Sequence, residues 1–311
     1  MQIYLPIAEL SLNIFFLIGI GGAVGFLSGM FGVGGGFLLT PLLIFSGIPA
    51  PVAVASVSGQ VVAASTSGAL SYMRRNLIDF HLALYLVLSG VIGAFLGVYT
   101  FSALRNAGQI DLVISVGYLV FLGFIGLIML NEAIRSLWRH KMGKDIAMKL
   151  PGQHNWVHGL PLRIRFKRSN LYVSVIPVLM IGSSIGFLGA LLGIGGGFIL
   201  VPALIYILRV PGSVVIGTSL VQVIAIMAAS VILHAMNNYS VDVLLAFCLM
   251  VGGVVGAQFG ASVGKIMRGD QLRAMLALIV LAVALRFAFL LFFTPEDIFS
   301  TSIISLSELV K

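Results

Sequence analysis

Two glycine clusters carry the residues whose type and spacing best suit binding chemistry. They read Gly-Val-Gly-Gly-Gly at 32–36 and Gly-Ile-Gly-Gly-Gly at 193–197, and each lies inside a long apolar run. A glycine inside a helix costs roughly 1 kcal/mol relative to alanine, so each cluster predicts a helix that stops and restarts. The restarting helix would present unpaired backbone N–H groups and the positive end of its dipole, and both stabilise a bound anion.

Six of these glycines are the candidate anion-binding residues of the backbone. They are Gly34, Gly35, Gly36, Gly195, Gly196 and Gly197. An alternative interpretation is that the glycines only allow helices to pack closely. The sequence excludes a phosphate-binding P-loop, because no Gly-Lys-Ser or Gly-Lys-Thr follows either cluster.

Polar side chains near the start of the third hydrophobic segment of each half are further candidates for substrate binding. They are Ser56, Ser58, Gln60, Thr218, Ser219 and Gln222. Hydroxyl and amide groups are costly inside lipid unless they have a partner, and an oxyanion would supply one. The alternative partner is a neighbouring helix. Ser65, Thr66 and Ser67 have apolar counterparts in the second half, so we interpret them as packing residues.

His234 and Arg286 are the candidate proton or anion relay residues within the apolar segments. Histidine titrates near neutral pH, although a capping or interfacial role is the alternative for His234. An arginine inside a span indicates function, unless its long side chain reaches the membrane surface. Asp79 and Asp242 each precede a predicted helix and are interpreted as N-cap residues.

Enzyme signatures are absent from the sequence. It contains no His-Glu-x-x-His or Gly-x-Ser-x-Gly motif and no carboxylate cluster inside an apolar segment. We therefore expect no enzyme activity, no catalytic residue, no metal site and no cofactor.

The composition places these residues in a membrane. Of the 311 residues 59% are hydrophobic and 9% are charged, whereas a soluble protein has about 25% charged residues. The run 10–73 contains no charged residue, and a transmembrane helix needs about 20 apolar residues. Half of the 18 Lys and Arg residues fall within 135–168. This asymmetry is typical of a cytoplasmic loop, so the net positive charge does not indicate a nucleic-acid partner.

The chain contains an internal repeat. The stretch 25–41 matches 186–202, at an offset of 161 residues. The predicted fold class is an all-α polytopic membrane protein with two inverted-topology repeats, each of about five hydrophobic segments and each opening with a glycine-broken helical hairpin. The predicted segments are 12–30, 36–47, 50–73, 81–102 and 111–135, then 171–192, 197–208, 212–236, 241–264 and 272–293.

Charge also predicts the boundaries and the topology. The first transmembrane repeat covers 10–135, a basic cytoplasmic linker covers 136–169, the second repeat covers 170–293, and a C-terminal tail covers 294–311. Arg74 and Arg75 mark one loop of the first half as cytoplasmic, whereas in the second half the cations mark the next loop along. Because the cations lie in non-equivalent loops, the two halves are predicted to have opposite orientations in the membrane. The chain would be a multi-pass protein of the cell inner membrane with both termini on the outer side.

The two halves each open with Gly-Phe-Leu, then Gly-Val/Ile-Gly-Gly-Gly-Phe and a proline. This doubled pattern resembles the sulfite exporter TauE/SafE family, also called the TSUP family, over about 12–293. The resemblance implies a secondary transporter of small sulfur-containing anions such as sulfite, sulfoacetate, taurine-derived sulfonates or thiosulfate. It also implies that the repeated glycines line the pathway, namely Gly32, Gly34, Gly35, Gly36, Gly193, Gly195, Gly196 and Gly197. The long basic linker departs from many relatives.

The resulting hypothesis is an exporter of sulfite or an organosulfonate that works by alternating access. Its partners would be a small anionic substrate and membrane lipid. The alternatives are a transporter that takes up thiosulfate or a carboxylate, an anion channel, and a membrane scaffold or enzyme subunit that acts through the linker. A homodimer is a candidate assembly, because glycines recur every four residues at Gly252, Gly256, Gly260 and Gly264 and suit either packing or a dimer contact.

Overall fold

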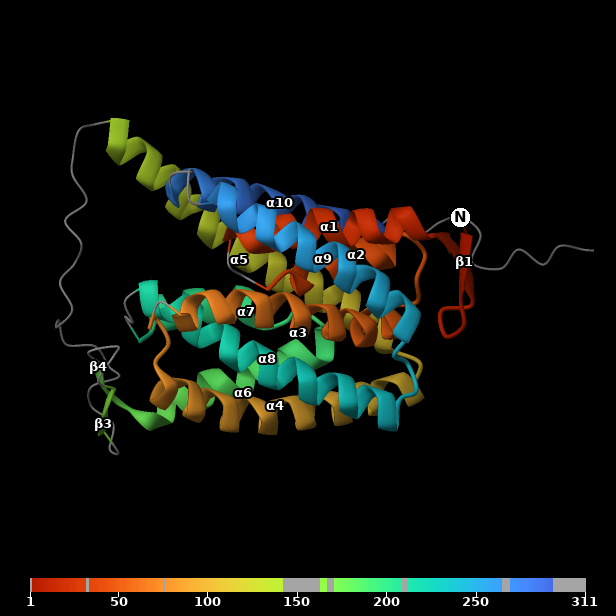
Figure 1. Cartoon of the computed structure of the whole chain (residues 1–311), viewed down its shortest axis with the longest axis horizontal. Helices are drawn as coiled ribbons and strands as arrows, with labels where there is room; N and C mark the ends of the chain where they lie inside the picture. The colour runs from red at the N-terminus through yellow and green to blue at the C-terminus, as the bar shows by residue number, and fades with distance from the viewer. Residues whose placement is uncertain are drawn as a thin grey trace, which may run out of the picture.

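A bundle of ten helices and two short β-hairpins makes up the described part of the chain (Figure 1). The computed structural model describes residues 2–31, 34–74, 76–141, 163–166, 171–208, 212–264 and 269–292. Most of the predicted linker and the whole tail from 293 onward lie outside these residues. So do Gly32 and two of the second-half cations, Lys265 and Arg268.

All ten predicted hydrophobic segments are helices. In the first half they are α1 (Ile14–Phe31), α2 (Gly36–Phe45), α3 (Ala50–Arg74), α4 (Phe80–Asn106) and α5 (Ile110–Lys141). In the second half they are α6 (Val175–Leu192), α7 (Gly197–Tyr206), α8 (Gly212–Asn237), α9 (Val243–Gly264) and α10 (Gly269–Phe292). The α5 helix runs six residues further than the segment predicted at 111–135.

A β-hairpin precedes the first helix of each half, which the sequence did not predict. The first joins β1 (Gln2–Leu5) to β2 (Leu10–Asn13), and the second joins β3 (Arg163–Phe166) to β4 (Leu171–Ser174). Both pairs are antiparallel and occupy equivalent positions 161 residues apart. Strands of four residues are too short to show a clear alternation of apolar and polar side chains, so periodicity cannot find them.

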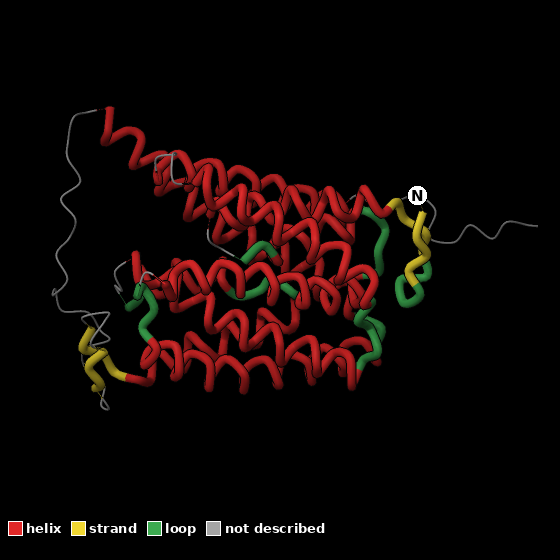
Figure 2. Tube along the Cα trace, in the orientation of Figure 1, coloured by secondary structure: helices red, strands yellow, loops and turns green. Residues whose placement is uncertain are grey.

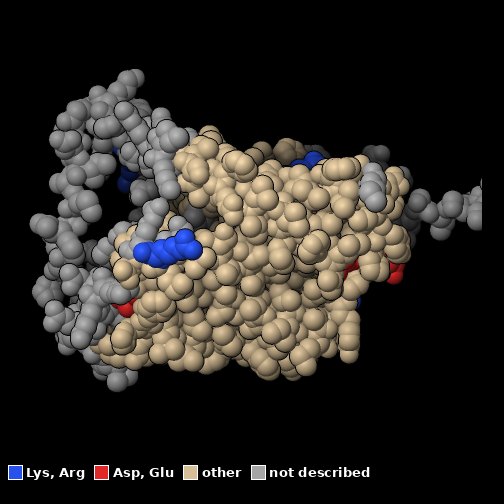
Figure 3. Space-filling model, in the orientation of Figure 1, with Lys and Arg blue, Asp and Glu red and all other residues tan. Residues whose placement is uncertain are grey.

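The helices suit a membrane by length and composition. Eight of the described helices are long and apolar enough to cross one. By contrast, α2 and α7 have ten residues each, about 15 Å at the helical rise, or half of a hydrocarbon core of about 30 Å. The broad face in Figure 3 is almost free of charged side chains, and most charges that show there lie near its ends. The chain is therefore an all-α polytopic membrane protein.

The helix contacts pair the two halves. The α1 helix packs on α9, and its counterpart α6 packs on α4. Across the middle, α3 packs on α8 and α5 packs on α10. Each contact therefore recurs when the two halves are exchanged. Figure 1 shows that α1 leaves its hairpin at one end of the bundle and α6 leaves its hairpin at the other end.

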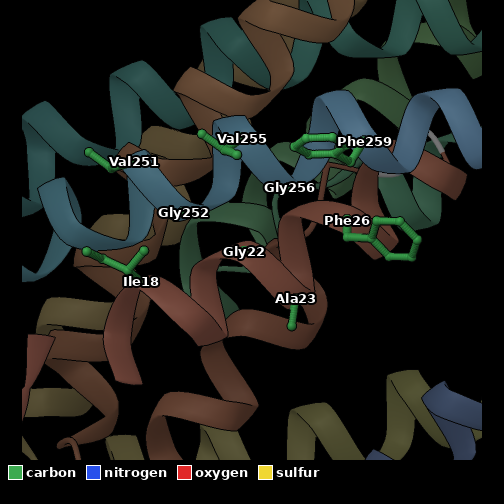
Figure 4. Close-up of a pocket in the computed structure, with 9 residues that line it drawn as sticks. All are labelled: Ile18, Gly22, Ala23, Phe26, Val251, Gly252, Val255, Gly256 and Phe259. Atoms are coloured by element: carbon green, nitrogen blue, oxygen red, sulfur yellow. The ribbon is translucent and has the colours of Figure 1, made fainter. Parts of the chain in front are cut away.

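Glycines bring α1 and α9 into backbone contact. A Cβ atom placed on Gly256 would lie 2.0 Å from the carbonyl oxygen of Gly22. Alongside this crossing lies an exposed apolar groove of about 410 Å³, with walls that include Phe26 of α1 and Phe259 of α9 (Figure 4). Gly252, Gly256 and Gly260 therefore pack within the chain, and α4 makes the equivalent contact with α6 through Gly93.

Replacing Gly256 with alanine tests this crossing. The added methyl group would meet backbone atoms that cannot move aside, and overpacking of this kind costs about 1–3 kcal/mol. We expect the melting temperature of the detergent-solubilised protein to fall by about 3 °C or more. Gly123→Ala is the control, because it adds the same atom at a helix position where no atom outside the helix's own backbone lies within 4 Å. Equal melting temperatures for the two variants would contradict the close crossing.

Candidate functional site

The two glycine clusters meet in the middle of the bundle. Figure 2 shows their loops between the helices near its centre. A Cβ atom placed on Gly36 would lie 2.7 Å from the Gly193 carbonyl oxygen. The rings of Phe37 and Phe198, which follow the clusters, stack with centroids 4.5 Å apart. Two segments far apart in the sequence therefore form one central site.

Each cluster makes the same tight turn before its half-length helix. The φ angles are +73° at Gly35 and +70° at Gly196, in the left-handed region that favours glycine. The Gly36 N–H donates to the Gly34 carbonyl at 3.0 Å, and the Gly197 N–H donates to the Gly195 carbonyl at 2.8 Å. The predicted break and restart of the helix is confirmed in both halves.

The start of α7 presents unpaired backbone donors. Among the described residues, the N–H groups of Gly195, Gly196 and Phe198 have no hydrogen-bond partner. The six candidate glycines are all buried. In the first half the equivalent N–H groups, those of Gly34, Gly35 and Phe37, adjoin Gly32 and Val33, which lie outside the described residues. Anion binding by these donors stays a prediction, and the geometry at α7 suits it.

The end of α6 is capped by side chains from three other helices. Tyr118 of α5 donates its hydroxyl to the Leu192 carbonyl at 2.8 Å. Thr40 of α2 donates to the Gly193 carbonyl at 3.3 Å, and His234 of α8 contacts the Ala190 carbonyl at 3.1 Å through Nε2. The last carbonyls of a helix have no partner inside it. These three side chains supply hydrogen-bond partners for those carbonyls and hold the second glycine turn in place.

The hydrogen bonds of His234 assign its neutral tautomer. Its Nε2 faces a carbonyl oxygen, which only accepts, so that nitrogen carries the proton. Its Nδ1 accepts from the Asn238 side-chain amide at 3.1 Å, and Asn238 in turn accepts from Ser102. The ring is therefore a fully bonded link between α8 and α6. A relay role for His234 stays a prediction.

The second candidate relay residue, Arg286, has different surroundings. It lies on the exposed face of α10, where its guanidinium carbon is 5.9 Å from the ring centroid of Phe45. An exposed position near the helix end suits a side chain that reaches toward the membrane surface. His234, in contrast, is fully buried.

The candidate hydroxyls have partners inside the bundle. Ser56 accepts from the Asp242 N–H at 2.9 Å, and at the equivalent place Thr218 accepts from the Asp79 N–H at 3.1 Å. The two aspartates cap the starts of α9 and α4, which confirms the N-cap prediction. Ser58 and Ser219 donate to carbonyls of their own helices, those of Val54 and Ile216. Substrate binding by these four residues stays a prediction.

The candidate glutamines lie at helix crossings. Gln60 contacts Gly253 of α9, and Gln222 contacts Gly90 of α4. Both side chains are fully buried, and neither the nitrogen nor the oxygen of the Gln60 side-chain amide has a hydrogen-bond partner among the described residues. The Gln222 amide reaches only the Gly182 carbonyl, at 3.5 Å. Their buried polar atoms suit water or a polar solute, because unpaired buried groups are rare.

Sequence reasoning missed three residues that contact the turns and interpreted a fourth, Ser65, only as a packing residue. The hydroxyl oxygen of Ser28 lies 3.3 Å from the Cβ position of Gly35, and that of Ser65 lies 3.6 Å from the Cβ position of Gly34. The other two are Thr40 and Tyr118. A signal was present for three of them, because at the aligned positions the second half has Gly189, Met227 and Val201. Comparing the halves for unmatched hydroxyls singles out Ser28 and Thr40 as it did Ser65, but it does not show that they lie beside the turns.

Comparisons with known proteins agree on one family. The family model described as "Sulfite exporter TauE/SafE" matches residues 17–287. A "Probable membrane transporter protein" of Xylella fastidiosa (strain 9a5c) is 30% identical over 272 residues, which are 86% of this chain and 92% of that protein. A probable membrane transporter protein of Bacillus subtilis (strain 168) is 28% identical over 266 residues, covering 85% of this chain and 95% of its own. No solved structure matches the chain.

A further relative carries a more specific name over a shorter match. "Sulfite exporter TauE/SafE family protein 5" of Arabidopsis thaliana is 31% identical over 130 residues, which are 41% of this chain and 28% of that protein. The names of these relatives describe transporters, not enzymes.

Replacing Ser56 with alanine separates its capping contact from substrate binding. The change leaves the Asp242 N–H without its partner, which costs about 1–3 kcal/mol for a buried donor. We expect a lower melting temperature and an unchanged apparent affinity in transport assays. Ser262→Ala is the control, because it removes an exposed hydroxyl that bonds only to its own helix. A weaker affinity at an unchanged melting temperature would instead support substrate binding by Ser56.

Replacing Tyr118 with phenylalanine tests the cap on α6. Loss of the hydroxyl leaves the Leu192 carbonyl without a donor, so we expect faster hydrogen exchange across residues 193–197 and a lower maximal transport rate. Tyr99→Phe is the control, because Tyr99 lies exposed on α4. Unchanged exchange in this segment would show that the other two caps are sufficient.

Proposed function

We propose that this chain, which belongs to the sulfite exporter TauE/SafE family of membrane transporters, carries small sulfur-containing anions such as sulfite or an organosulfonate. The observation that carries the proposal is the buried pair of glycine turns with unpaired N–H groups at the start of α7. Sulfite and sulfonate groups are compact and have several oxygen atoms that accept hydrogen bonds. Backbone N–H groups at a helix start suit them.

The charge distribution supports a carried anion rather than a tightly held one. No Lys or Arg side chain is buried within the described ranges. Binding by backbone dipoles and hydroxyl groups avoids a fixed positive charge, which would hold the anion too strongly to release it. The membrane potential, negative inside, favours exit of an anion by about 2.3 kcal/mol per charge and 100 mV. Export therefore needs no coupling ion.

Alternating access by two inverted repeats is the mechanism that we infer. The helix contacts recur when the halves are exchanged, and α1 and α6 start at opposite ends of the bundle (Figure 1). Short helices that meet midway between such repeats are a recurrent transporter design. We place the basic linker and β3 in the cytoplasm and the N-terminal hairpin outside, in the inner membrane, because basic residues favour the cytoplasmic side.

Flux into and out of proteoliposomes tests the function. The purified protein would be screened with sulfite, sulfoacetate, taurine, thiosulfate, sulfate and acetate, each over a range of concentrations. We expect saturable flux of sulfite or of an organosulfonate, stronger than that of acetate. Flux that never saturates would favour an anion channel, and flux of acetate alone would contradict the sulfur-containing substrate.

Gly196→Ala connects that flux to the glycine turn. A side chain at this φ angle costs about 1–2 kcal/mol, and its Cβ atom would lie 2.8 Å from Ile185. We expect flux to fall by about tenfold or more, since 1.4 kcal/mol corresponds to a factor of ten. Gly47→Ala is the matched control, because Gly47 has a φ of +90° but nothing lies within 4 Å of its Cβ position. Equal flux in both variants would remove the case for a site at the turn.

A further inference from the structure

The first glycine turn has the hydroxyl groups of two buried serines, Ser28 and Ser65, beside it. Ser65 of α3 is 1% exposed, and its hydroxyl has no hydrogen-bond partner among the described residues. Ser28 of α1 is 6% exposed. Their oxygen atoms lie 3.6 and 3.3 Å from the Cβ positions of Gly34 and Gly35. Both therefore point at the turn that begins α2.

Ser65 differs from two other hydroxyl residues of its own helix. On α3, Ser58 and Thr66 each donate to the carbonyl four residues earlier, at 3.0 and 2.7 Å. Such a bond is available to a helical serine at little cost. Ser65 does not make it. A buried hydroxyl without a partner is unfavourable, so Ser65, with Ser28 beside the same turn, indicates an acceptor that binds there. Ser230 on α8 is a further buried hydroxyl without a partner among the described residues.

The second glycine turn lacks both hydroxyl groups. The residues aligned with Ser28 and Ser65 are Gly189 and Met227. The terminal methyl group of Met227 and the Gly196 nitrogen lie 3.0 and 3.7 Å from the Cβ position of Gly189, so an apolar group lies where a hydroxyl would be. The hydroxyls that do reach this turn, those of Thr40 and Tyr118, already donate hydrogen bonds to carbonyls at the end of α6.

We infer that the transported oxyanion binds asymmetrically, at the first glycine turn, where Ser28 and Ser65 donate hydrogen bonds to its oxygen atoms. The inference rests on the proposed transport function and deepens it. The ligand class is a group with several oxygen atoms on one centre, such as sulfite or a sulfonate, because the two hydroxyls and the backbone N–H groups need separate acceptors. Val61 and Val223 flank Gly34 as apolar walls, with methyl groups 3.9 Å from its Cβ position. The second turn acts as the fixed side of the site.

Single alanine variants of Ser28 and Ser65 test the inference. Each removes one hydrogen bond to a charged ligand, so we expect the apparent KM for the anion identified in the flux screen to rise about tenfold. The maximal rate and the melting temperature should stay near those of the wild type, because no protein group loses a partner. Ser65→Thr keeps the hydroxyl and should keep the KM. Ser89→Ala is the control, because it removes a buried hydroxyl that bonds within α4.

Moving the hydroxyl tests the asymmetry. In the Ser65→Ala protein, Met227→Ser places a hydroxyl at the equivalent position beside the second turn. We expect no recovery of the KM, and recovery would overturn binding at the first turn alone. Saturable wild-type flux with an unchanged KM in both Ser28→Ala and Ser65→Ala would overturn the inference and leave the proposed function standing. If the wild type carries none of the screened anions, the proposed function fails and the inference fails with it.

Discussion

The structure depends on how the backbone N–H and carbonyl groups in the middle of the bundle find hydrogen-bond partners. Lipid offers no hydrogen-bond partner to an N–H or a carbonyl, so every break in a helix within the membrane must be compensated by protein, by water in a cavity or by a ligand. The chain nevertheless breaks two helices there, at Gly35 and Gly196. Three side chains from other helices, those of Tyr118, Thr40 and His234, hydrogen-bond to carbonyls at the end of α6. Among the described residues, the N–H groups of Gly195, Gly196 and Phe198 at the second break receive no such compensation.

The surrounding helices hold these turns because glycines let the helices pack closely and because side chains from the other half hydrogen-bond to the helix starts. Gly256 lets α9 approach α1 at backbone distance, and the equivalent crossing joins α4 to α6. The α9 and α4 helices each begin at an aspartate whose own N–H donates to a hydroxyl of the other half, that of Ser56 or Thr218. Both links cross between the repeats, so each half helps to position the helix starts of the other.

Much of this architecture could be predicted from the sequence, because its causes are local. Glycine triplets predict helix breaks, long uncharged runs predict spans, and an aspartate before an apolar run predicts a cap, as Asp79 and Asp242 confirm. The partners of individual side chains depend on which helices meet, and local patterns do not contain that information. Ser56 has a backbone N–H as its partner, Ser65 has none, and both are buried serines on the same helix.

The differences between the halves are therefore more informative than the repeat itself. Duplication explains why the backbone makes the same turn twice, with φ angles of +73° and +70°. It does not explain why hydroxyls face one turn and a methionine lies beside the other. A carrier with two identical sites facing each other would hold two anions that repel, whereas the proposed binding at one of the two turns would define a single position. In the proposed mechanism, a symmetric backbone would allow both sides to open, and asymmetric side chains would decide where the solute binds.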